Sequence, residues 1–375
     1  MKPIYFYIFT ILAILTSCIE KKTSKNIDDL IVSIDTQNDA IITDDPVFTK
    51  MRYVKLETKE DCLLENVTKV VPFSNKLYIL TSLGQGNVFI FDDKGKFVKK
   101  ITKGNGPEDI IYPTDITIDS NKKNLLILDY YRNITKYDLN GNFIQKTSME
   151  EPFLALESIG EDFLLFDPNT RSKANYHLRY MTDKSKSKDF FLKPLKGKLF
   201  YSSNFFTKID NEKVLVSCIL SDTIFYITNT QKDLLPYMVL DFHDKNANKK
   251  DRLDKINDLG EYLRNAENQN YITGPSELSI INDNIFFALN GKDYYYTKYD
   301  TKKKTISLHK NLIEGLPNIY MSVGRTDKEV IYSMDIPWLI EHFEENPEIK
   351  TDIIKQLKEE CNNENDNPVL LFGSF

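Results

Sequence analysis

The sequence predicts an all-β fold of the propeller type, and three observations support this prediction. Beyond Pro46, short apolar or alternating runs recur between turn residues, a texture typical of a sandwich, a barrel or a propeller. Aromatic residues are frequent, with 21 Tyr and 23 Phe, and such residues favour strands. An internal repeat with a period in the forties then favours the propeller among the three architectures.

The repeat is read directly from the chain. Residues 87–100 (NVFIFDDKGKFVKK) align with residues 133–146 (NITKYDLNGNFIQK), 46 residues further on. Each copy reads as a strand, a turn and a second strand, with Gly95 and Gly141 where a hairpin needs a positive φ. A fainter third copy (TKYD) lies at residues 297–300. We interpret these copies as parts of propeller blades.

Two segments depart from the β pattern. Residues 249–268 place Leu253, Ile256, Leu259 and Leu263 at helical spacing, which predicts a short helical insertion. Residues 337–361 predict one or two further helices, the second beginning at Pro347. We expect a strand at 368–372 to end the chain, and the propeller domain to span residues 46–375.

The N-terminus predicts export and lipidation. Lys2, an apolar run at residues 4–15 and two small residues before Cys18 form a signal peptide over residues 1–17. The run is shorter than the roughly 20 residues that a membrane span needs. The order Leu-Thr-Ser-Cys resembles the lipobox of bacterial lipoproteins, in which the cysteine is acylated and becomes the new N-terminus. The alternative is an ordinary signal peptide with a chance cysteine.

Residues 18–45 are then expected to be a lipidated N-terminus and a polar tether, with one apolar patch at 30–32 that could pair as a strand. Several acyl chains anchor a protein stably where one does not. We therefore expect a bacterial membrane, the outer membrane first, as one partner. The periplasmic and the surface face remain alternatives.

Part of the chain resembles an NHL-type propeller repeat. The resemblance comprises a glycine-rich lead-in at 104–108 (GNGPE), then 113–119 (PTDITID), 127–129 (ILD) and the segment from Tyr137 to Phe143. The lead-in lacks the third glycine of the pattern.

Over about residues 45–375 the chain resembles the six-bladed β-propeller lipoproteins of gut-type anaerobic bacteria, through 53–58 (YVKLET) and 367–371 (NPVLL) as well as the lead-in. The resemblance implies six blades and a ring closed by strands at 53–57 and 369–372. Residues 63–66 (LLEN) depart from the Leu-Ile-Gly expected there. The family has no settled biochemical activity, so the resemblance implies fold and location.

Charge and cysteine content restrict the function further. The formal net charge of −6 argues against nucleic acid, whose binding depends on a basic face. Cys62, Cys218 and Cys361 remain beside Cys18, and an odd set is not a disulfide framework. We expect three independent cysteines, although one bridge among them stays open.

The sequence carries no strong catalytic motif and predicts no cofactor and no metal. His177, His243, His309 and His342 are scattered without metal-ligand spacing. The one candidate binding cluster is Asp129, Tyr130, Tyr131 and Arg132, at the predicted end of an inner strand, because tyrosine and arginine are frequent at binding hot spots. The alternative, which the pattern favours, is that Asp129 caps the turn and Arg132 pairs with a neighbouring carboxylate.

These features favour a non-catalytic binding or scaffold propeller in the cell envelope, with an envelope protein or a glycan as candidate ligand. The rival hypothesis is a propeller enzyme (a lyase, a lactonase or a glycan-acting hydrolase) with its site at the channel mouth. A third is a lipoprotein that works beside an outer-membrane transporter.

Overall fold

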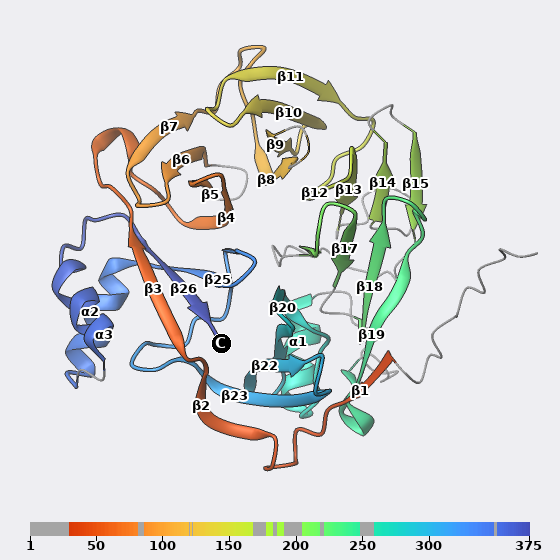
Figure 1. Cartoon of the computed structure of the whole chain (residues 1–375), viewed down its shortest axis with the longest axis vertical. Helices are drawn as coiled ribbons and strands as arrows, with labels where there is room; N and C mark the ends of the chain where they lie inside the picture. Colours follow the sequence, from red (N-terminus) through yellow and green to blue (C-terminus); the bar gives the residue numbers. More distant parts are fainter. Residues whose placement is uncertain are drawn as a thin grey trace, which may run out of the picture.

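In the computed structural model the chain folds into a ring of radially arranged β-sheets (Figure 1), which confirms the predicted all-β propeller. The residues that the structure describes are 30–81, 86–119, 121, 123–167, 178–182, 186–190, 205–217, 221–247, 259–348 and 351–375. Within them the strands form six four-stranded blades. The first strand of each blade lies at the channel and the fourth lies at the rim.

The first three blades follow one another in the sequence. Blade 1 contains β4 (Val67–Phe73), β5 (Lys76–Thr81), β6 (Val88–Asp92) and β7 (Phe97–Ile101). Blade 2 contains β8 (Pro113–Asp119), β9 (Asn124–Asp129), β10 (Asn133–Asp138) and β11 (Phe143–Ser148). Blade 3 contains β12 (Ala155–Ile159), β13 (Asp162–Phe166), β14 (Leu178–Met181) and β15 (Ser187–Phe190).

The last three blades also take up the N-terminal strands. Blade 4 contains β16 (Phe206–Lys208), β17 (Lys213–Val216), β18 (Thr223–Thr228) and β19 (Leu235–Asp241), with β1 (Ile31–Ser33) added outside. Blade 5 contains β20 (Ser276–Ile281), β21 (Asn284–Asn290), β22 (Tyr294–Asp300) and β23 (Thr305–Ile313), with β2 (Ile42–Phe48) added outside. Blade 6 contains β24 (Gly324–Arg325), β25 (Val330–Met334), β26 (Val369–Ser374) and β3 (Lys50–Lys55).

The hydrophobic core is divided among the blade interfaces. The buried apolar residues of the described chain form six clusters, and each cluster lies between two neighbouring blades. At the channel, blades 6 and 1 also share a parallel bridge between Gly324 and Val70. A Cβ on Gly324 would lie 2.1 Å from the Val70 carbonyl oxygen, so only glycine permits this approach.

The ring closes by pairing the two ends of the chain. β26 lies antiparallel to β3, with Leu370 opposite Val54 and Leu371 opposite Tyr53. This arrangement confirms the closing pair expected at residues 369–372 and 53–57.

The expected boundary at residue 46 is wrong, because the folded body begins earlier. β1 pairs in parallel with β19, and β2 pairs in parallel with β23. Ile34 is buried in the cluster between blades 4 and 5. Short apolar patches within the polar stretch 18–45 are enough to extend two rim edges. Residues 1–29, including Cys18 and the predicted signal peptide, lie outside the described residues.

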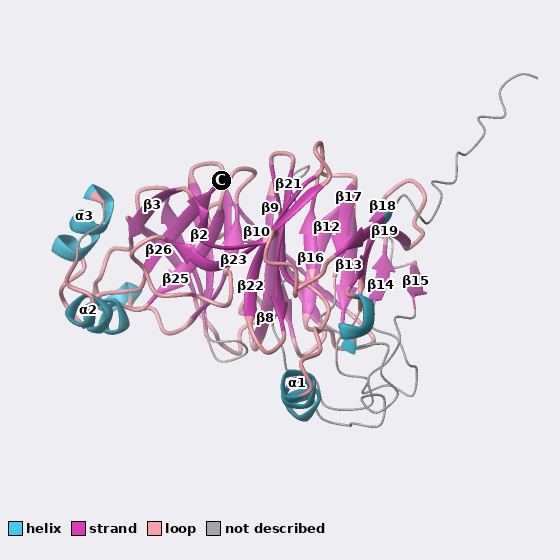
Figure 2. Ribbon diagram, turned by 90° about the horizontal axis from the view of Figure 1, so that it is seen from below, coloured by secondary structure: helices cyan, strands magenta, loops and turns pink. Residues whose placement is uncertain are grey.

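The predicted helices are found with changed limits. α1 (Leu259–Asn268) is the described part of the expected insertion and lies below the ring in Figure 2; residues 248–258 lie outside the described chain. α2 (Ile336–Glu345) and α3 (Asp352–Glu360) cover the outside of blade 6. The prediction for Pro347 is wrong: α3 begins after Thr351, whose Oγ1 accepts from the Ile354 N–H.

The aligned repeat corresponds to the outer hairpins of blades 1 and 2. Gly95 and Gly141 have φ of 85° and 75°, as the turn requires. Asp92 Oδ1 accepts from the backbone N–H groups of Lys94 and Lys96, and Asp138 Oδ1 accepts from the two corresponding groups of its own turn. These aspartates therefore serve as turn caps.

We predict that Asn367→Ala destabilises the closed ring. Asn367 is 2% exposed; its Nδ2 donates to the carbonyls of Glu57 and Cys62, and its Oδ1 accepts from the Leu64 N–H, each at 2.8 Å. Loss of these buried hydrogen bonds should lower the free energy of unfolding by about 2–4 kcal/mol, measured by urea denaturation. The matched control is the exposed Asn362→Ala. Equal stability of the two variants would contradict the prediction.

Candidate functional site

The channel of the ring contains a cavity of about 570 Å³. Residues from all six inner strands line it, among them Thr117, Glu157, Lys208, Ser279 and Arg325. The cavity opens at the end of the channel where the inner strands finish, since turn residues such as Asp210 and Asp327 also line it. This volume lies within the usual range of small-molecule sites, about 300–1,000 Å³.

Each inner strand has a charged residue at its second or third position, and β8 has a further one, Asp119, at its end. We call the six residues at the second or third position the charged belt: Lys69 on β4, Asp115 on β8, Glu157 on β12, Lys208 on β16, Glu277 on β20 and Arg325 on β24. Three are acidic and three are basic. Sequence reasoning missed the belt, because its members lie some 40 or more residues apart and only the ring brings them together. The single available signal was that Lys69 and Asp115 stand 46 residues apart, at the repeat offset.

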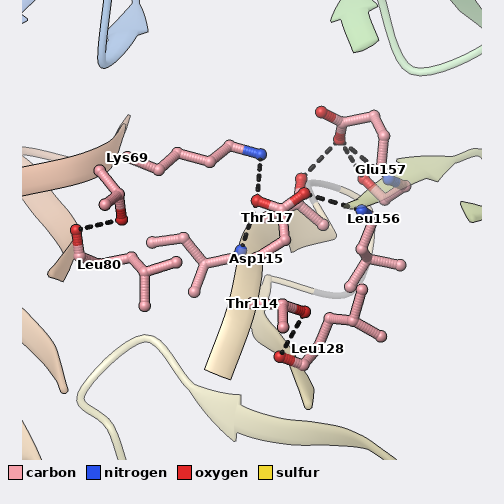
Figure 3. A network of polar contacts seen from close by, with 11 residues as sticks. Lys69, Leu80, Thr114, Asp115, Thr117, Leu128, Leu156 and Glu157 are labelled. Carbon is pink, nitrogen blue, oxygen red and sulfur yellow. Dashed lines mark hydrogen bonds and ion pairs between the residues drawn. The ribbon is translucent and has the colours of Figure 1, made fainter. Parts of the chain in front are cut away.

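The first link of the belt joins blades 1, 2 and 3 (Figure 3). Lys69 Nζ donates to Asp115 Oδ1 at 2.7 Å, and the backbone N–H of Leu156 donates to Asp115 Oδ2 at 2.7 Å. Asp115 is buried. Burial raises the pKa of this carboxyl, while the Lys69 ammonium and the backbone donors bring the pKa partly back down.

The strands that carry Lys69 and Asp115 begin in the same way. Thr68 and Thr114, one residue earlier, donate to the carbonyls of Leu80 and Leu128 on the second strand of their blades. Both inner strands have a register shift at this point. A β-bulge changes the direction of the side chain that follows it, here Lys69 and Asp115. Blades 1 and 2 therefore share the local geometry that places these two side chains, in addition to the repeated outer hairpin.

Glu157 forms the second link, between blades 2 and 3. Its Oε1 accepts from Thr117 Oγ1 at 2.5 Å and from the Ser158 N–H at 2.9 Å. Ser158 Oγ in turn accepts from Lys208 Nζ at 2.7 Å. These contacts extend the polar chain from blade 2 to blade 4.

Arg325 connects blade 6 with two other blades. Its guanidinium donates to the carbonyl of Ile280 on blade 5 at 3.3 Å and to the carbonyl of Lys208 on blade 4. Burial lowers the pKa of Arg325, whereas the negative charges of Glu157 and Asp327 raise it. The cation therefore lies across the channel, with neutral oxygens as its hydrogen-bond acceptors.

Glu277 lies behind the cavity and joins blade 5 to the loop that leads into blade 6. Its Oε2 accepts from Ser322 N at 2.7 Å and from Ser322 Oγ at 2.6 Å. Its backbone has a φ of 57°, a left-handed conformation that is uncommon for a residue with a side chain. Burial raises the pKa of Glu277 to about 7, although the Ser322 hydrogen bonds oppose the shift.

The cluster predicted from the sequence lies elsewhere. Asp129 is buried; its Oδ2 accepts from the N–H groups of Ile111 and Tyr112, and its Oδ1 accepts from the Tyr131 N–H. It thus caps the loop, as the structural alternative expected. Arg132 donates to the Glu150 carbonyl, a backbone oxygen in place of the expected carboxylate.

The tyrosines of this cluster form an aromatic group with Tyr112. Ring centroids lie 5.5 Å apart for Tyr112 and Tyr130 and 6.1 Å apart for Tyr112 and Tyr131, whose side chain is 60% exposed. The group lies at the start of β8, opposite the end that borders the cavity. The structure therefore does not bring the predicted residues to the charged belt, and their role in binding stays a prediction.

The described histidines lie away from the cavity lining. Ser33 Oγ is 2.9 Å from His243 Nε2, and His243 Nδ1 is 3.6 Å from Asp241 Oδ2. This order resembles a hydrolytic triad, but the acid is too far for a hydrogen bond and the His243 side chain is 49% exposed. A triad needs an oriented base in a site that excludes water. We assign this contact no catalytic role.

Among the described residues no group of three or more His, Cys, Asp and Glu is arranged to hold a metal. Cys62 and Cys361 are buried and free, while Cys218 lies outside the described part of the chain. The described helices include none that is both long and apolar enough to span a membrane.

Comparison with known proteins gives a family and a fold. A family model described as a domain of unknown function, DUF4934, matches residues 29–374. The chain belongs to the DUF4934 family. The match begins just before Leu30, where the described body of this DUF4934 chain begins. The comparison with curated proteins found no match.

One of the solved structures that are similar to this DUF4934 chain supports its fold. A crystal structure of a Bacteroides fragilis protein assigned as exported is 21% identical, with a TM-score of 0.76 over 91% of this chain and 98% of that chain. A Bacteroides caccae protein of unknown function is 13% identical over 65% of this chain and 81% of that chain, with a TM-score of 0.41. The WD40 domain of Neurospora crassa Pan2 is 7% identical over 71% of each chain, with a TM-score of 0.42. Only the first likeness is close enough to support the fold.

We predict that Glu277 makes stability depend on pH. Because its pKa is about 7 in the folded chain and 4.5 in a model peptide, the folded state keeps a proton that the unfolded state releases. The free energy of unfolding should therefore fall as the pH rises from about 4.5 past 7, by roughly 3 kcal/mol from this group. Glu277→Gln should remove this part of the slope in urea denaturation between pH 5 and pH 8.

The matched control is Glu344→Gln, an exposed glutamate on α2, which should keep the wild-type slope. The same slope in all three proteins would show that Glu277 is ionised in the folded chain throughout this range.

Proposed function

We propose that this DUF4934 chain is an exported, lipid-anchored binding propeller of the bacterial envelope, and that its central cavity takes a small ligand. The observation that carries the proposal is the cavity of about 570 Å³, which all six inner strands line. It combines charged groups of the belt with apolar lining from Phe73, Phe206 and Leu278. A concave site with a few convergent polar groups is the usual form of a ligand pocket.

Binding without turnover is supported by the state of the acidic groups. Asp115, Glu157 and Glu277 each accept two or more hydrogen bonds from protein donors. A general base must instead reach a proton on the substrate. The described cavity lining also contains no histidine and no cysteine, the usual partners of an activated nucleophile.

The enzyme hypothesis keeps one supporting observation. Glu157, Lys208 and Arg325 converge on a single cavity, and an acid beside two cations is a set that lyases and glycan-acting hydrolases could use. Glu157→Gln separates the two proposals: a binder still binds its ligand and shows no turnover in either form, whereas an enzyme loses turnover. Envelope glycans and lactones are the substrates to assay.

Lipid anchoring is supported by the order of residues 15–18 and by where the body begins. Cys18 lies 12 residues before Leu30, the first residue of the described body. Even fully extended, at about 3.3 Å per residue, this segment reaches only about 40 Å. We propose that the six-bladed ring is held close to the bilayer by a lipid on Cys18.

We predict that Cys18→Ser abolishes lipid attachment. The variant should incorporate no alkyne-labelled fatty acid in cells and should leave the membrane fraction, since the thiol that carries the acyl groups is gone. Cys62→Ser, which keeps a donor for the Glu57 carbonyl, should be labelled like the wild type. Labelling of the Cys18 variant at the wild-type level would rule out this anchor.

We predict that the residues 19–375 protein binds a small molecule from an extract of envelope metabolites. The purified protein is equilibrated with the extract, washed, denatured and examined by mass spectrometry for released compounds. Ser279→Trp, which fills the cavity from its wall, is the matched control and should release none. Identical profiles from the two proteins would refute a ligand site in the cavity.

A further inference from the structure

The three cations of the charged belt differ in what neutralises them. Lys69 has Asp115 at 2.7 Å. Lys208 and Arg325 form no ion pair with any carboxylate of the described chain; their acceptors are Ser158 Oγ and the two backbone carbonyls already named. Two of the three positive charges therefore enter the cavity without a counter-ion in contact.

The Arg325 guanidinium is fixed in position by two hydrogen bonds, but these do not use all of its N–H donors. A guanidinium has five N–H donors in a rigid plane, and the carbonyls of Ile280 and Lys208 fix its position from two other blades. A partly buried cation without a paired anion is costly, consistent with the lowered pKa of this group. The free donors of Arg325 and Lys208 are thus preorganised for an acceptor that bears negative charge.

The charges at the cavity floor do not cancel. Lys69 and Asp115 neutralise each other, which leaves Glu157 opposed to Lys208 and Arg325 and gives one excess positive charge. Glu277 lies apart, bonded to Ser322. Asp210 and Asp327 are exposed at the rim, where solvent screens them more than the floor. The floor therefore favours an anion, and the apolar lining favours an organic ligand.

We propose that the cavity binds the oxyanion group of a small organic molecule, a carboxylate or a phosphate ester, between Lys208 and Arg325. This inference rests on the proposed binding function of the same cavity. The anion supplies a counter-ion in direct contact, which neither cation has among the described residues.

The test is calorimetric titration of the residues 19–375 protein at constant ionic strength. The probes are butyrate and inorganic phosphate as oxyanions, glucose as a neutral molecule and putrescine as a cation. We expect saturable one-to-one binding of an oxyanion. Lys208→Met and Arg325→Gln should each weaken it at least about tenfold, the effect of losing one hydrogen bond to a charged group.

The matched control is Lys303→Met, the same change at a turn where the side chain is 78% exposed; it should leave the affinity unchanged. If Arg325→Gln does not fold, Lys208→Met alone still tests the proposed oxyanion site. Preference for butyrate identifies a carboxylate ligand, and preference for phosphate identifies a phosphate ester.

Two results would overturn the inference. One is the absence of saturable oxyanion binding to the wild-type protein, and the other is binding that neither variant weakens. If glucose, putrescine or an extract metabolite still binds in the cavity, the binding function stands and the oxyanion site falls. If nothing binds, including the extract, both fall together.

Discussion

Closure of the ring by β3 and β26 is the constraint on which the rest of the structure depends. Six residue pairs join the strands, from Val369 with Lys55 to Ser374 with Lys50. They bring together segments more than 300 residues apart, at an entropic cost that grows only with the logarithm of loop length. The pairing gives blade 6 its fourth strand and covers a sheet edge that would otherwise be free. Without it, Arg325 would have no fixed relation to blades 4 and 5.

The closed ring separates two kinds of interaction. Apolar side chains fill the wedges between neighbouring blades, in one cluster per interface. At the inner edge, side chains from adjacent blades meet through hydrogen bonds such as Lys69 with Asp115 and Thr207 with the Leu278 carbonyl. The polar contacts fix the rotation of each blade relative to the next, because hydrogen bonds are directional and apolar packing is less so. The cavity inherits its geometry from this fixed register.

The sequence predicted what is local and missed what depends on closure. The hairpins around Gly95 and Gly141 were predicted because turn chemistry is written in adjacent residues. The apolar patch at 30–32 was expected to be able to pair, as β1 does, but the start of β2 was assigned to the tether because Asp44 and Asp45 interrupt its apolar pattern. The charged belt was missed for a different reason: each member is an ordinary charged residue in its own strand. Asp129 was predicted to take part in binding, yet its carboxylate oxygens accept hydrogen bonds from three backbone N–H groups.

The position of β1 has a consequence for how the ring is presented to its surroundings. β1 lies on the outer edge of blade 4, beside β19 (Figure 1). Whatever precedes Leu30 is thus joined at the circumference, away from the channel axis. A ring that is attached at its circumference can be oriented with its channel axis parallel to the surface that carries it. In that orientation both openings of the channel face the surrounding medium, and neither opening is covered by the surface that carries the ring.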